Sequence, residues 1–164
     1  MRKAFTLVEI LIVVVILGII AAIVIPRFSN ASATARASML GDQLRVTRMQ
    51  IEVFKAQHVG VPPGYPQCNR SQTPTEDAFV QYMTGFSDSA GTMNPVSGRR
   101  FGPYLREVPV NPVNDKSSVL VLAYGDEFPT QASDQYGWIY QPSTLKFKAD
   151  STGADEDGKA FFDY

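Results

Sequence analysis

The chain has 164 residues, of which 45% are hydrophobic and 19% are charged, and its formal net charge is −1. This composition excludes a disordered or collagen-like chain. The near-neutral charge argues against a nucleic-acid-binding protein, because binding phosphates needs a basic face. The single cysteine, Cys68, excludes an internal disulfide scaffold. One folded domain remains, and it is preceded by a strongly apolar segment.

The apolar segment is long enough to cross a membrane. From Ile10 to Ile25 every residue is apolar or glycine, and the run extends back to Phe5 across two polar positions. At a rise of about 1.5 Å per residue, the whole run spans about 30 Å. Arg2 and Lys3 precede it, and basic residues favour the cytoplasmic side. We therefore predict a single membrane span with a cytoplasmic N-terminus, which sends everything after Pro26 across the membrane.

A secretory signal peptide is the alternative interpretation of this segment, since it also combines a basic start with an apolar stretch. The run is longer than the roughly 7 to 15 apolar residues that are typical of signal peptides. Ala31-Ser32-Ala33 still offers a small-x-small cleavage site, so this alternative stays open.

Residues 29–59 continue as a polar helix, because they contain no proline and a single glycine, Gly41. Two apolar stripes recur at helical spacing. The first stripe contains Leu40, Leu44, Thr47, Ile51 and Phe54, and the second contains Met39, Val46, Met49 and Val53. Either both stripes lie in the core of one domain, or one packs on the domain and the other on neighbouring subunits. We expect Arg45, Arg48, Glu52 and Lys55 to form the solvated arc between them.

The sequence after residue 59 predicts a small folded domain, which we call the head. Glycine and proline residues at 60–66 end the long helix. A short helix started by Thr73 or Thr75 follows, then a β-rich run over 118–124 and a hairpin with arms at 138–141 and 145–148. The predicted fold class is α+β. It consists of a long N-terminal helix, transmembrane in its first half, packed on a small antiparallel sheet.

Glu9 is unusual because an ionisable side chain inside an apolar span costs free energy unless it finds a partner or reaches the headgroups. It lies about one helical turn inside the span. Contact between its carboxylate and the lipid headgroups is therefore enough to explain a charge at Glu9 when that residue is considered by itself.

Residues 2–9 have the sequence Arg-Lys-Ala-Phe-Thr-Leu-Val-Glu, and the apolar run that follows contains Gly18 and leads to Pro26. Together these residues resemble the N-terminal signature of type IV pilins and type II secretion pseudopilins. The resemblance implies cleavage between Ala4 and Phe5 by a membrane prepilin peptidase, followed by methylation of the new N-terminus. Residues 1–4 are then the leader, 5–26 the transmembrane and assembly half of the helix, 27–59 its amphipathic half, and 60–164 the periplasmic head. Family members usually have glycine at the position of Ala4.

The resemblance supplies a partner for Glu9. A new amino group at Phe5 is the natural counter-ion for a carboxylate in a low-dielectric bundle, and methylation leaves it charged. Glu9 lies roughly 6 Å along the helix axis from Phe5, so it can reach its own terminus or that of the next subunit. The family favours the neighbour, and the pair would set the stagger between subunits. In family filaments the segment between Gly18 and Pro26 can unwind; alternatively, Pro26 only marks the membrane exit.

Three downstream segments resemble the head of major pseudopilins: Gly102-Pro103-Tyr104-Leu105, Asn111-Pro112 and Gly137-Trp138. The chain departs from that subgroup at Val113 and Asn114, where major pseudopilins have Trp-Gly. Major pseudopilins hold Ca²⁺ in a C-terminal loop, and oxygen ligands dense in sequence suit that ion. The candidate ligands are Asp150, Ser151, Asp155, Asp157 and Asp163. A solvated acidic tail is the alternative, and no other cofactor is implied.

Nothing in the sequence predicts an enzyme. His58 is the only histidine, and no pattern brings it to Cys68 as a base beside a nucleophile. We expect His58 to cap the long helix as a cation. Cys68 is expected to be a loop thiol that is reduced, buried or paired between chains.

The resulting hypothesis is a bacterial inner-membrane protein with a cytoplasmic N-terminus and a periplasmic head, which polymerises into a periplasmic or surface filament. Its implied partners are further copies of the chain, the prepilin peptidase, minor pseudopilins or pilins, an inner-membrane assembly platform with its ATPase, and the membrane before assembly. A type II secretion pseudopilus, without nucleic acid, is the favoured function. The alternatives are a type IV pilin for adhesion, motility or DNA uptake, and a non-polymerising, signal-anchored periplasmic binding module.

Overall fold

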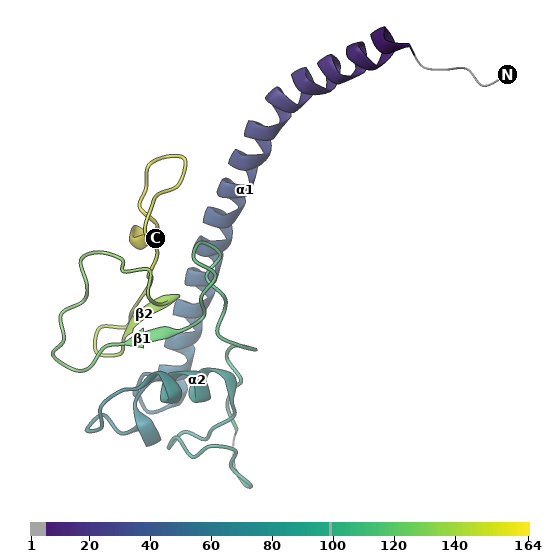
Figure 1. Cartoon of the computed structure of the whole chain (residues 1–164). Helices are drawn as coiled ribbons and strands as arrows, with labels where there is room; N and C mark the ends of the chain where they lie inside the picture. Colours follow the sequence, from purple (N-terminus) through teal and green to yellow (C-terminus); the bar gives the residue numbers. More distant parts are fainter. Residues whose placement is uncertain (1–5, 99) are drawn as a thin grey trace.

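The computed structural model describes residues 6–98 and 100–164, with residues 25–31 described by their backbone alone. The elements follow in the order α1 (Leu7–Gln57), η1 (Pro66–Cys68), α2 (Glu76–Thr84), β1 (Val119–Val121), β2 (Trp138–Gln141), β3 (Lys146–Ala149) and η2 (Phe161–Asp163). Figure 1 shows α1 as a long curved helix whose N-terminal half projects away from a head formed by the other elements. The predicted α+β fold class is confirmed.

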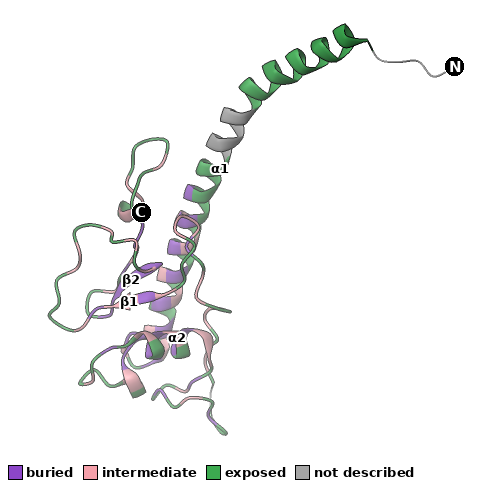
Figure 2. Cartoon of the chain, in the orientation of Figure 1, coloured by how far each residue is buried: buried purple, intermediate pink, exposed green. Residues whose placement is uncertain are grey.

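Helix α1 is a continuous helix of 51 residues, which makes it about 76 Å long. Its segment Leu7–Val24 has the length and composition of a membrane span, criteria that a signal sequence also meets, and none of it is buried against the rest of the chain. Figure 2 shows this half of α1 as exposed and the other half as buried along one side. An exposed apolar surface of this extent requires lipid or other chains to cover it.

The C-terminal half of α1 packs on the head through only one of its two apolar stripes. The first stripe, Leu40, Leu44, Thr47, Ile51 and Phe54, is buried. The second stripe stays exposed, with exposed fractions of 53% for Met39, 37% for Val46, 50% for Met49 and 38% for Val53. The structure therefore excludes the interpretation that both stripes lie in the core of the same chain.

Helix α2 and the sheet complete this core. Thr75 caps α2 as predicted, because its hydroxyl oxygen accepts a hydrogen bond from the Ala78 N–H at 3.2 Å. Phe79 of α2 is fully buried and meets the ring of Tyr140 from β2, with 4.9 Å between the ring centroids. Trp138 and Phe147 stack across the hairpin at 5.3 Å. Aromatic rings from α2 and from the hairpin thus pack against one another in this core.

The sheet has the order β1-β2-β3 and is mixed. Strands β2 and β3 form the predicted antiparallel hairpin, with Tyr140 opposite Phe147. Strand β1 runs parallel to β2, with Val119 opposite Trp138. The prediction of a wholly antiparallel sheet is therefore wrong for β1. The long connection between β1 and β2 returns the chain to the same end of the sheet, as a parallel pair requires.

A buried amide network fixes the loop segments that resemble pseudopilin heads. The Asn111 side-chain NH₂ donates to the Gly137 carbonyl at 2.8 Å and to Ser151 Oγ at 2.9 Å. The indole N–H of Trp138 donates to the Pro109 carbonyl at 2.8 Å. A Cβ atom at Gly137 would come within 2.1 Å of a neighbouring backbone oxygen, so only glycine fits there. These contacts explain why Asn111, Gly137 and Trp138 stand in the Asn-Pro and Gly-Trp pairs.

The C-terminal end of α1 is fixed by His58, which is the C-cap residue and is fully buried. Its ring stacks on Phe54, with 3.8 Å between centroids. Nδ1 lies 2.9 Å from the Phe54 carbonyl oxygen, which can only accept, so Nδ1 carries the proton and Nε2 accepts from the Ser87 hydroxyl at 2.8 Å. Burial lowers the pKa of His58. His58 therefore occupies the predicted capping position, but its burial and lowered pKa favour the neutral imidazole over the predicted cation.

We expect the free energy of unfolding to fall as the pH drops below about 6.5. Unfolded His58 takes up a proton near 6.5, whereas the folded residue resists protonation because its pKa is lower. The contribution is therefore complete above that pH and is lost as the pH falls toward the folded-state pKa. Urea unfolding of the full chain in detergent between about pH 5 and 8 measures it.

His58→Phe is the matched control, because it keeps the ring and removes the only histidine of the chain. The pH dependence in this window should flatten in the variant. An identical slope in the variant and the parent protein would contradict the assignment.

Candidate assembly site at the N-terminus of helix α1

Helix α1 begins with a reciprocal cap. Thr6 Oγ1 accepts a hydrogen bond from the Glu9 backbone N–H at 3.2 Å, and Glu9 Oε2 accepts one from the Thr6 backbone N–H at 3.3 Å. This is a capping box, in which a threonine and a glutamate three residues later satisfy each other's backbone donors. The Thr-x-x-Glu spacing that signals it is present in the sequence, but the sequence analysis considered Glu9 only as a charge in an apolar span.

The cap turns the Glu9 carboxylate back toward the N-terminal end of the helix. Its Oε2 also lies 3.4 Å from the Thr6 hydroxyl. A negative charge at this end interacts favourably with the helix dipole. Glu9 is therefore not an orphaned charge, and its carboxylate lies beside the residue that directly follows Phe5. Ala4 and Phe5, the predicted cleavage positions, lie outside the described residues.

The other two predicted assembly residues lie farther along α1. At Gly18 a Cβ atom would meet nothing within 4 Å in the described part of the chain, so no packing within this chain requires a glycine. The helix passes through position 26, but the side chain of Pro26 is outside the description. Unwinding between these two residues in a filament stays a prediction.

Two of the five candidate calcium ligands are fixed inside the head. Asp150 is buried, and its carboxylate accepts hydrogen bonds from the Ser133 N–H at 2.5 Å, the Ser133 hydroxyl at 2.7 Å and the Tyr136 N–H at 2.9 Å. Burial acts to raise the pKa of Asp150, but these hydrogen bonds outweigh it and hold the pKa below its ordinary value. Ser151 is also buried, and its Oγ accepts from Asn111.

The other three candidate ligands have hydrogen-bond or ion-pair partners that differ from those of Asp150 and Ser151, or are exposed. The Asp155 carboxylate accepts from the backbone N–H groups of Asp157 at 3.0 Å and Lys159 at 2.9 Å, and from the hydroxyl of Tyr164. The Tyr164 hydroxyl is the main cause of the lowered pKa of Asp155. Asp157 is exposed, and Asp163 pairs with Lys148. Over the described residues, no three His, Cys, Asp or Glu side chains gather closely enough to hold a metal ion.

The two residues considered for catalysis are not brought together by their hydrogen bonds. His58 bonds to Ser87, as described above. Cys68 is a free, half-buried thiol, and burial raises its pKa. Gly91 lies so close that a Cβ there would approach Cys68 Sγ to 2.6 Å. Cys68 therefore packs as a small apolar residue and does not have the lowered pKa of a reactive thiolate.

Comparison with known proteins finds a motif match at this N-terminus and two distant relatives of the chain. Residues 1–25 match the family model described as the prokaryotic N-terminal methylation motif. The chain is 28% identical over 111 residues to the type II secretion system core protein G of Pseudomonas aeruginosa, covering 68% of each chain. The chain therefore carries a prepilin-type methylation motif and is distantly homologous to a pseudopilin and to a fimbrial protein.

A second pilin-family relative is the fimbrial protein EcpB of Eikenella corrodens, which is 34% identical over 100 residues. That match covers 61% of this chain and 57% of EcpB. No solved structure gives a significant match. Pilin-family proteins are structural and non-enzymatic, and the methylation motif implies processing by a prepilin peptidase and general pilus-assembly partners. The motif and the apolar helix are consistent with anchoring in the inner membrane before assembly.

We expect Thr6→Val to loosen the first turn of α1. Valine keeps the β-branched shape but removes the hydroxyl oxygen that accepts from Glu9. Loss of an N-cap costs about 1 kcal/mol, or about a fivefold increase in local opening. Amide hydrogen exchange at residues 7–10 in micelles measures it. Thr6→Ser, which keeps the acceptor, should exchange like the parent protein; equal exchange in both variants would refute the capping role.

Proposed function

We propose that the chain is a structural subunit that is anchored in the inner membrane, cleaved between Ala4 and Phe5, methylated at Phe5 and polymerised through α1. In this proposal residues 1–4 are the leader, 5–26 the assembly half of the helix, 27–59 its amphipathic half and 60–164 the periplasmic head. The observation that carries it is the exposed apolar half of α1, which begins with a carboxylate at its N-terminal end.

The position of Glu9 supports pairing with a processed N-terminus. Cleavage before Phe5 would create an ammonium group one residue before Thr6, to whose N–H the Glu9 carboxylate is already bonded. Desolvation of both charges offsets much of their attraction, so the pair adds little net stability. A subunit in the wrong alignment would leave two charges uncompensated in an apolar bundle. If the ammonium belongs to the next subunit, as the family resemblance favours, the pair selects one stagger between neighbouring subunits.

The exposed second stripe of α1 extends the same interface beyond the membrane. Met39, Val46, Met49 and Val53 recur at intervals of seven, three and four residues. This spacing is typical of helices that pack side by side. We assign this stripe to contacts with neighbouring subunits, because the first stripe alone packs on the head of its own chain. Lipid and bundle are similarly apolar, so extraction from the membrane needs an external drive from an assembly platform and its ATPase.

We place the filament in a type II secretion pseudopilus that supports protein export across the outer membrane. The match to the type II secretion core protein covers more of this chain than the match to the fimbrial protein. A type IV pilin that forms surface fibres is the second candidate, and the higher identity to EcpB favours it. A non-polymerising, signal-anchored periplasmic binding module is the alternative outside filament assembly.

We expect Glu9→Gln to block filament assembly and leave a membrane-inserted monomer. Glutamine keeps the size of the side chain and removes the charge that pairs with the processed N-terminus. Filaments sheared from cells and quantified by electron microscopy should fall at least tenfold. Asp42→Asn, an exposed carboxylate on the same helix, is the matched control and should assemble normally. A normal yield from Glu9→Gln would argue against the pairing.

The biological role is tested by the native N-terminus and by deletion of the chain. Mass spectrometry should find a chain that begins at Phe5 with one added methyl group. A chain beginning at Met1 or after Ala33 would instead support the binding module. Deletion should abolish protein export; long surface fibres that are lost without any export defect would identify the type IV pilin alternative.

A further inference from the structure

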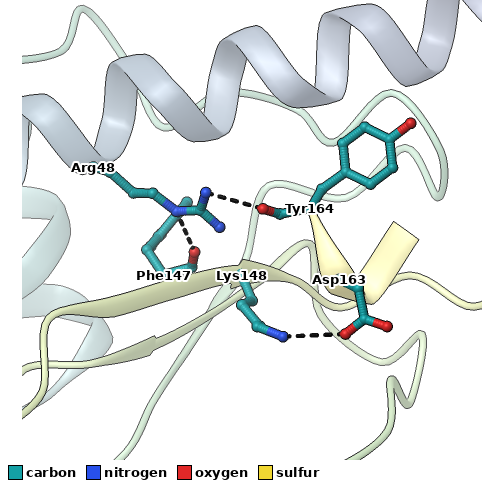
Figure 3. Close-up of polar contacts among 5 residues, drawn as sticks. All are labelled: Arg48, Phe147, Lys148, Asp163 and Tyr164. Atoms are coloured by element: carbon teal, nitrogen blue, oxygen red, sulfur yellow. Dashed lines mark hydrogen bonds and ion pairs between the residues drawn. The ribbon is translucent and has the colours of Figure 1, made fainter. Parts of the chain in front are cut away.

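The last fifteen residues return to helix α1 after the hairpin. We call residues 150–164 the C-terminal segment. Arg48 of α1 joins it to the sheet: its Nε donates to the Phe147 carbonyl at 2.9 Å, and a terminal guanidinium nitrogen donates to the backbone oxygen of Tyr164 at 3.0 Å (Figure 3). One side chain thus connects the helix, the edge strand β3 and the end of the segment.

Arg48 is half-buried, in contrast to the solvated position expected from the sequence. It lies one turn from Leu44 and from Ile51 of the first stripe, so the guanidinium leaves the helix on the side that faces the head. Burial lowers the pKa of Arg48, but a guanidinium stays charged in proteins because its ordinary pKa is so high. The desolvated cation is compensated by two backbone oxygens, of Phe147 and Tyr164, that accept its hydrogen bonds.

A second cation, Lys148 of β3, reinforces the same closure. Lys148 Nζ lies 3.4 Å from Asp163 Oδ1 (Figure 3), and the same ammonium lies 4.4 Å from the centroid of the Phe162 ring. The Tyr164 ring packs over α1, where a Cβ at Gly41 would lie 3.7 Å from its Cδ1. The segment therefore returns to the helix at Gly41.

We propose that Arg48 holds the C-terminal segment on α1 and that this closure needs no divalent cation. A calcium ion would close the loop by gathering its oxygen ligands. Here the carboxylates of Asp150 and Asp155 each accept three hydrogen bonds from protein donors, and Asp163 faces Lys148. Calcium binding would have to break these bonds, whereas the guanidinium already supplies the positive charge that joins the segment to the helix.

The first test uses the unassembled full chain in detergent, so its outcome does not depend on whether the chain forms filaments. Thermal unfolding and amide hydrogen exchange of residues 150–164 are measured with EGTA and with about 1 mM Ca²⁺. The melting temperature should agree within about 1 °C, and the exchange rates should be the same. A higher melting temperature or slower exchange with calcium would overturn the proposal.

The second test removes the guanidinium. Arg48→Met keeps an unbranched apolar stem without donors and should speed exchange in residues 158–164 at least tenfold. Arg45→Met is the matched control, because Arg45 is 71% exposed and pairs only with the exposed Asp42 among the contacts described. If the methionine variant does not fold, Arg48→Lys keeps the charge without the two-pronged donor and should give an intermediate increase. Unchanged exchange in the folded variant would also overturn the proposal.

Discussion

Leu7–Val24, the first half of α1, buries nothing against the described remainder of its own chain, and this constrains the rest of the molecule. A helix in water would not expose this much apolar surface without cost. The segment therefore needs lipid or neighbouring helices, and both environments exclude unpaired backbone donors and isolated charges. The capping box at Thr6 and Glu9 meets that requirement at the start of the helix, where the backbone donors have no partners within the helix.

The second half of α1 has a different task, because the head does not enclose a core without it. The sheet has three strands of three or four residues each, which is too small to stand alone. Leu44, Ile51 and Phe54 of the helix fill the space beneath it. The stem and the head therefore form a single folding unit, even though they have separate roles in the proposed filament. A change in the packing of α1 on the sheet would affect both roles together.

Periodicity explains why much of this fold can be predicted from the sequence. The first stripe repeats at the helical period, and Phe147 and Ala149 alternate with lysines at the strand period, so both signals are local. The parallel pairing of β1 is set by a long crossover, which has no such signal. Arg48 and His58 were misjudged because their type predicts a solvated or charged group, whereas their surroundings supply carbonyl and hydroxyl partners. Acidic residues near each other in sequence likewise do not converge, because different protein donors bind Asp150, Asp155 and Asp163 separately.

The second stripe has a mechanical consequence that follows from the chemistry of its side chains. Met39 and Met49 provide the most exposed surface on it. Methionine is unbranched and polarisable, so it adapts to irregular neighbours without a large loss of contact. Helices that pack through such side chains can shift along one another over short distances and form new contacts. A fibre assembled on this surface would bend elastically under load, while the ionic pair proposed for Glu9 would keep its subunits in alignment.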